Sequence, residues 1–287
     1  MRLDRLAACL KVSICLLAAV HCGAAIAADA DSGLAPAAES SAAGAEDTPE
    51  GTPEEGTLSE LEIGREALLA KDYATAYRLL RNAAEQGDAQ AQTALGAMYL
   101  AGQGVDADVA VALSWYQKAA EQGDAEAQVS LGVMYADGRG VARDDEAAVK
   151  WFRLAAEMED PAAQSYLGMM YLDGRGVEKN EAKAAELLQM AALHGEPQAQ
   201  YKLGIMFLDG RGVERDAAAA AQWFQRAADQ GHALAQYHLG VSYAKGRGVE
   251  QDREQAIKWM TSAALQGLSL AKDYLRANGN ITVESGK

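Results

Sequence analysis

Histidines and paired acids are the residues of this 287-residue chain best suited to proton transfer or metal binding. Beyond residue 27 the histidines are His194, His232 and His238, and no cysteine accompanies them. A zinc site needs three or four converging ligands, and no paired-histidine helical motif is present. The acid pair Asp144-Asp145 fits a helix start, where the helix dipole favours carboxylates. We therefore predict no catalytic residue, no metal, no cofactor and no enzyme activity.

Five Gly-x-Gly-Val loops raise a second chemical possibility, a backbone cradle for phosphate. None of them has the Gly-Lys-Ser/Thr ending of a phosphate-binding loop, and each lies between two predicted helices instead of after a strand. We interpret them as turns between helices. The loops begin at Gly102, Gly138, Gly174, Gly210 and Gly246.

The elements that position these loops belong to a repeat of 36 residues. The pair Leu-Gly recurs at this spacing without slippage, and such self-similarity outranks local propensity in predicting the fold. The five pairs begin at Leu95, Leu131, Leu167, Leu203 and Leu239. The five units are residues 89–124, 125–160, 161–196, 197–232 and 233–268. A tryptophan recurs at Trp115, Trp151, Trp223 and Trp259 and is predicted to pack between helices.

Each unit contains two apolar stripes with i, i+3, i+4 spacing, which predicts two helices. Aspartates or asparagine stand where most of these helices would begin, and glycines stand where the second helices would end. Glu159 interrupts the glycine series, so one bend is expected to differ. The predicted first-helix caps are Asp88, Asp124 and Asp160, with Pro161 and Pro197 in first turns, and the second-helix caps are Asp108, Asp144, Asn180, Asp216 and Asp252.

A helix pair cannot bury its own apolar stripe, so neighbouring units must stack. The predicted fold is all-α, an α-solenoid: a right-handed superhelix of about five 36-residue helix-turn-helix repeats with terminal capping helices. Residues 57–88 are assigned to an N-terminal capping helix pair and residues 89–268 to the five repeats. Residues 269–287 are assigned to a C-terminal capping helix and tail.

Residues 1–27 have the pattern of a secretory signal peptide, with Arg2 and Arg5 before an apolar run and a small-residue cleavage site ending at Ala27. The following residues, 28–56, are predicted to be a disordered acidic linker. We therefore expect a periplasmic or secreted protein with no transmembrane segment. A lipid on Cys22 is the alternative, which the preceding histidine disfavours.

The chain carries a net charge of -15, which phosphate backbones would repel. Nucleic acid is accordingly excluded as a partner. The repeats themselves indicate another kind of partner. Residues 125–135 have the pattern Ala-x-x-Gln-x-x-Leu-Gly-x-Met-Tyr, and the other units repeat most of it. Together with the Gly-x-Gly-Val loop, this pattern resembles the Sel-one-like repeat family, which is related to tetratricopeptide repeats. This resemblance implies a protein-binding adaptor. One branch of the family is cysteine-rich and binds penicillin-type compounds, but the repeats of this chain contain no cysteine.

The binding residues are expected where the repeats differ, on the concave side formed by the first helices. Two adjacent positions, three and two residues before the Leu-Gly glycine, collect tyrosines toward the C-terminal half. Packing between repeats is the alternative role for these rings. The partner-binding candidates are Tyr166, Tyr201, Lys202, Tyr237, His238 and Tyr274.

The leading hypothesis is an exported, non-catalytic scaffold that binds a protein or peptide on its concave face, in cell-envelope assembly, signalling or host interaction. The alternative is an envelope enzyme or binding protein for a cell-wall glycan or β-lactam, of the kind proposed for cysteine-rich relatives. A third class is a structural component of a secretion or polysaccharide-export complex in the envelope.

Overall fold

A computed structural model describes residues 58–278 of the chain. The predicted signal peptide at 1–27, the acidic linker at 28–56 and the last tail residues lie outside this part. Thirteen α-helices and no strand occur in residues 58–278, so the all-α prediction is confirmed. The chain divides into two compact units whose boundary follows Ala107, in the loop after the first Gly-x-Gly-Val turn.

The first unit is described from residue 58 and contains three helices that pack in chain order. Gly64 takes the place of the Leu-Gly glycine, and the space that a Cβ would need there is filled by Leu80. The bounds of these helices are α2 (Glu60–Leu69), α3 (Tyr73–Glu85) and α4 (Ala89–Ala101).

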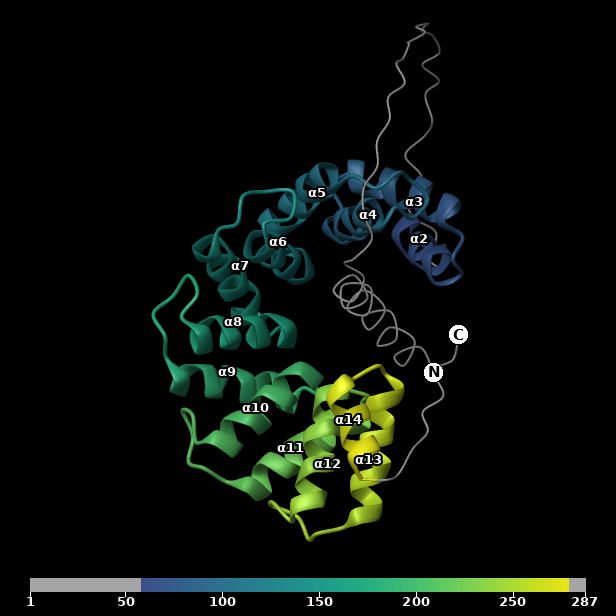
Figure 1. Cartoon of the computed structure of the whole chain (residues 1–287). Coiled ribbons are helices and arrows are strands. Elements are labelled where there is room, and N and C mark those ends of the chain that lie inside the picture. Colours follow the sequence, from purple (N-terminus) through teal and green to yellow (C-terminus); the bar gives the residue numbers. More distant parts are fainter. Residues whose placement is uncertain (1–57, 279–287) are drawn as a thin grey trace, which may run out of the picture. The chain divides into compact units, whose positions relative to one another are not determined.

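The second unit is a stack in which every helix packs against the next one along the chain (Figure 1). This serial packing is the arrangement of a helical solenoid, because each helix pair buries its apolar stripe against a neighbouring pair. Its helices are α5 (Val109–Glu121), α6 (Ala125–Asp137), α7 (Asp145–Glu157), α8 (Pro161–Asp173), α9 (Glu181–Leu193), α10 (Pro197–Asp209), α11 (Ala217–Asp229), α12 (Ala233–Lys245), α13 (Arg253–Leu265) and α14 (Ser269–Ala277).

The predicted caps are confirmed at both kinds of helix. On the first helices, the Asp160 carboxylate accepts a hydrogen bond from the Ala163 N–H at 2.7 Å, and on the second helices Asp144 accepts one from Ala147 at 2.9 Å. Glu159 has a φ of 61° and so keeps the left-handed bend that glycines make elsewhere, such as Gly231 with a φ of 87°. The expectation of a different bend at Glu159 is therefore wrong, because a non-glycine residue makes the same left-handed bend there.

The buried anchor of each second helix lies one residue after the recurrent tryptophan position. Phe152 and Phe224 are at most 1% exposed, whereas Trp151 is only half-buried. Each phenylalanine ring fills the space that a Cβ would need at a Leu-Gly glycine, Gly132 for Phe152 and Gly204 for Phe224. The glycine is thus required because it lets a large side chain of the second helix pack directly on the first.

The Gly-x-Gly-Val loops pack on the first turn of the preceding second helix. A Cβ on Gly176 would collide with the carbonyl group of Asp145, so the backbones approach too closely for any other residue.

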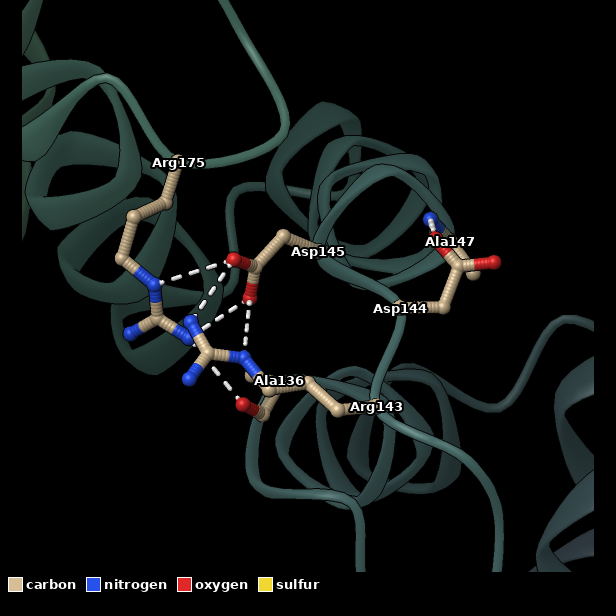
Figure 2. A network of polar contacts seen from close by, with 6 residues as sticks. All are labelled: Ala136, Arg143, Asp144, Asp145, Ala147 and Arg175. Atoms are coloured by element: carbon tan, nitrogen blue, oxygen red, sulfur yellow. Dashed lines mark hydrogen bonds and ion pairs between the residues drawn. The ribbon is translucent and has the colours of Figure 1, made fainter.

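The arginine before this glycine reaches the same turn. Arg175 donates to the Asp145 carboxylate at 2.6 Å and to the carbonyl oxygen of Ala136 at 3.0 Å (Figure 2). Arg143 also pairs with Asp145, at 2.9 Å. The hydrogen bond from Arg175 is the largest cause that holds the pKa of Asp145 at about 2.

A buried glutamine in each first helix makes the other polar link of the repeat. Gln200 donates to the carbonyl oxygen of Ala192 at 3.1 Å, and its own oxygen accepts a hydrogen bond from Gln230 at 2.9 Å. The oxygen of Gln128 is buried without a hydrogen-bond partner, because Met158 stands where the donating glutamine would be. The polar network therefore differs between repeats that share one backbone geometry.

Candidate partner-binding site

The six predicted binding residues all lie on first helices of the second unit or on α14. Each occupies one of two adjacent positions of its helix, so the series faces the same way from repeat to repeat. Tyr201 is 9% exposed and the others are half-buried. They lie on α8 (Tyr166), α10 (Tyr201 and Lys202), α12 (Tyr237 and His238) and α14 (Tyr274).

Tyr166 lies flat on the buried ring of the preceding second helix. Its ring centroid is 5.0 Å from that of Phe152, and the two planes differ by 9°. Burial raises the pKa of the Tyr166 hydroxyl, and the nearby carboxylates of Glu196 and Asp137 raise it further. The phenol therefore stays neutral beside acids from the end of α6 and the N-cap of α10.

His238 repeats this stacking two units later. Its ring lies 5.2 Å from Phe224 with an interplanar angle of 26°, and the edge of Tyr237 meets it at 5.5 Å. Burial lowers the pKa of His238, while the Asp209 carboxylate acts in the opposite direction. The position two residues before the glycine is thus a platform above the buried ring, occupied by Tyr166 in one repeat and by His238 in another.

Tyr201 packs more deeply than the other candidates. Its ring stacks on His232 at 4.7 Å and contacts Phe224 at 6.1 Å. Much of the ring therefore supports neighbouring residues, as the packing alternative predicts, and only a small area is open to a partner. Its role as a direct contact remains a prediction.

His232 also belongs to this cluster, although it was not among the predicted binding residues. It caps α12, where Nδ1 accepts a hydrogen bond from the Ala235 N–H at 3.1 Å, and Nε2 lies 2.9 Å from the Gln198 side-chain oxygen. An accepting Nδ1 assigns the proton to Nε2, and burial lowers the pKa of the ring. The departure from the aspartate caps at Asp88, Asp124 and Asp160 was the signal in the sequence.

The structure brings together only part of the predicted set. In residues 58–278, ring contacts join Tyr201, His232, Tyr237 and His238 in one cluster that also includes Phe224. Tyr166 stacks separately on Phe152. Tyr274 packs against the apolar cluster that contains Met260, and Lys202 lies near His232, whose pKa it helps to lower.

The described residues hold no group of three or more His, Cys, Asp or Glu side chains arranged for a metal ion. Within residues 58–278, no helix is both long enough and apolar enough to cross a bilayer.

The chain belongs to the Sel1 repeat family. The family model matches residues 61–88, 89–124, 125–160, 161–196, 197–232 and 233–268. The match adds a short repeat at 61–88 to the five full units. Proteins built from Sel1 repeats generally mediate protein–protein interaction and are typically non-catalytic scaffolds. A search of curated proteins found no match.

Two solved structures of the same fold resemble this chain. The protective antigen c5321 of uropathogenic Escherichia coli strains, which displays an SLR fold, is 40% identical with a TM-score of 0.68; the match covers 77% of this chain and 49% of the antigen. A Sel1 repeat protein from Oxalobacter formigenes is 33% identical with a TM-score of 0.72 and coverage of 80% and 93%. This chain therefore spans about half the length of the E. coli antigen.

Proposed function

We propose that this protein is an exported, non-catalytic adaptor that binds a protein or peptide partner on the first-helix surface of its later repeats. The export part of the proposal rests on the pattern of residues 1–27 and 28–56, and a mature N-terminus at Ala28 is the mass-spectrometric result it requires. Periplasmic or secreted location and a role in an envelope complex follow from export in this proposal.

The observation that carries the binding proposal is the change in residue type at two aligned positions. In repeat 125–160 these positions hold Val129 and Ser130, whereas repeat 233–268 places Tyr237 and His238 there. The backbone is the same in both repeats, so stacking does not require aromatic side chains at these positions. Half-buried tyrosines on a repeated surface are typical anchors of protein interfaces, because they give contact area at low entropic cost.

The test replaces the rings with residues that the same positions hold in other repeats. The double variant Tyr166→Ser, Tyr237→Ser borrows Ser130 and Ser165, so the fold should be retained. With a partner purified after affinity capture from envelope extracts, we expect the Kd to rise more than about 30-fold, the equivalent of about 2 kcal/mol.

A matched control changes the second helices in the same way. Leu154→Lys and Leu193→Glu borrow the residues at Lys118 and Glu157, and both leucines are exposed. This control should bind as the unaltered protein does. Equal binding by the tyrosine variant, with an unchanged thermal unfolding midpoint, would place the partner on another surface.

A further inference from the structure

One stripe of each first helix in the second unit lies on the side of Tyr166 and His238. Its members are half-buried or exposed, except Ser130 and Val133 on α6, which are buried. Its members follow i, i+4, i+7 and i+11 spacing, which puts them on one side of the helix. We call this surface the first-helix face. It comprises Glu126, Ser130, Val133 and Asp137 on α6, Ala162, Tyr166, Met169 and Asp173 on α8, Gln198, Lys202, Ile205 and Asp209 on α10, and Leu234, His238, Val241 and Lys245 on α12.

Carboxylates stand at both ends of the first three of these helices. Asp137, Asp173 and Asp209 are the last residues of α6, α8 and α10, and all three are exposed. Asp124, Asp160 and Glu196 precede the same helices at the N-cap positions. The fourth helix, α12, has His232 at its N-cap and ends at Lys245. The first-helix face is therefore acidic at its ends over α6, α8 and α10, where Lys202 in the middle of α10 is the one basic side chain, and this acidic character ends at α12.

An aromatic ring lies within the acidic part of this face. Tyr166 is half-buried on Phe152, and the carboxylates of Asp137, at the end of α6, and Glu196, at the N-cap of α10, act on it. A Lys or Arg side chain is attracted both to the face of an electron-rich ring and to carboxylates beside it. The surroundings of Tyr166 suit a cationic side chain better than an anionic one.

Apolar side chains occupy the middle of the same face. Met169, Ile205 and Val241 are half-buried and pack against the repeat cores from their inner sides. A partner that buries these side chains must itself have apolar groups between its charges. A small cation alone would leave this row uncovered.

We infer that the first-helix face binds a cationic, partly apolar peptide segment of its partner, with a Lys or Arg side chain over Tyr166 and a neutral or acidic end of the segment over α12. The inference rests on the proposed function, and it adds the chemistry and the direction of the bound segment. The carboxylates at the helix ends attract the segment, and the apolar row holds it in place.

The test uses fluorescein-labelled synthetic peptides of 12 residues and the full mature chain. One peptide alternates Lys or Arg with Leu and Tyr, and the second replaces every basic residue with Glu. In fluorescence anisotropy we expect the basic peptide to bind at least 10-fold more tightly than the acidic one. Replacing Asp137, Asp173 and Asp209 with Asn should weaken binding of the basic peptide at least 10-fold. Tyr166→Ser should also weaken its binding, while Tyr166→Phe should retain it.

A charge-matched control separates this site from general attraction to an acidic protein. Glu121→Gln, Glu157→Gln and Asp229→Asn remove three exposed carboxylates from second helices and should change the Kd less than twofold. Equal weakening by both triple variants, or equal binding of both peptides, overturns the inference. If only an acidic or neutral peptide binds and Tyr166→Ser weakens it, the cation preference is wrong and the proposed function stands. If no peptide binds and the captured partner binds the tyrosine variants as tightly as the unaltered protein, the proposed function fails as well.

Discussion

Helices α7 and α11 occupy the same position in their repeats but are held by side chains at opposite ends. At the start of α7, Asp145 pairs with Arg175 of the next repeat, while at its end Met158 has no amide to offer Gln128. At the start of α11, Ala217 has no carboxylate for the corresponding arginine. The end of α11 is instead held by Gln230, which donates to the Gly195 carbonyl oxygen and to the Gln200 side-chain oxygen, both at 2.9 Å.

Helices α9 and α13 show the same two kinds of link. Helix α9 begins with Glu181, which pairs with Arg211 at 3.0 Å, and ends beside His194. Helix α13 begins with Arg253 and is followed by Gln266, whose side chain donates to Gln236 at 2.9 Å. Helices α7 and α9 thus use an ion pair, and α11 and α13 use an amide link. Since the backbone is the same in both, the shared core determines the geometry and either polar link is sufficient.

The largest expected effect concerns that shared core. Phe152→Ala in α7 and Phe224→Ala in α11 should each destabilise the second unit by about 3–5 kcal/mol, because both rings are buried and fill the space beside a glycine. Urea unfolding followed by circular dichroism measures the two losses. Trp151→Ala should cost clearly less, since this ring is half-buried. A large loss in only one of the two phenylalanine variants would show that the two regions do not share one type of core.

An intermediate effect is expected from exchanging the two residues that follow α7 and α11, Met158 and Gln230. Gln230→Met removes the donor to the buried Gln200 oxygen and should cost about 1–3 kcal/mol, whereas Met158→Gln supplies a donor to Gln128 and should gain about 0.5–1.5 kcal/mol. Native-state hydrogen exchange at the ends of α7 and α11 reports each change locally. If Met158→Gln gains nothing, the Gln128 oxygen is already satisfied in solution.

The smallest effect is expected at the helix starts. Asp145→Asn should cost at most about 1 kcal/mol, because the pair with Arg175 is partly exposed. The folded-state pKa of Asp145 is about 2, below its ordinary value of 3.8, so its contribution is complete above pH 3.8 and disappears as the pH falls toward 2. Urea midpoints at pH 6 and pH 2.5 should therefore differ less in the variant. Arg247→Gln, at the position aligned with Arg175 two repeats later, should have no such effect.

The sequence was sufficient for the repeat, the helices and their caps, because these features depend on short-range patterns that recur every 36 residues. The phase of the buried stripe was harder to predict. Trp151 and Phe152 are adjacent and both recur as large side chains, and only the position of Gly132 in space shows which ring packs inward. A register error of one residue rotates the helix by about 100°.

The sequence predicted which aligned helix positions the candidate residues occupy, but not how deeply each side chain is buried. Aligned positions identified Tyr166, Tyr201 and Tyr237 without any structure. The burial of Tyr201 depends on His232, which comes from a different helix terminus 31 residues away, and no local pattern links the two. The carboxylates around Tyr166 likewise come from the end of α6 and the N-cap of α10, so their proximity is a property of helix stacking.

The hydrogen bonds between repeats join residues that are close together along the chain. Arg175 reaches Asp145 across 30 residues and Ala136 across 39, and Gln230 reaches Gly195 across 35. Each link can therefore close once about one further repeat has left the ribosome. Chains dominated by such local contacts fold rapidly, and N-terminal parts can fold during synthesis. An exported chain with this property would have to be kept unfolded by chaperones before translocation.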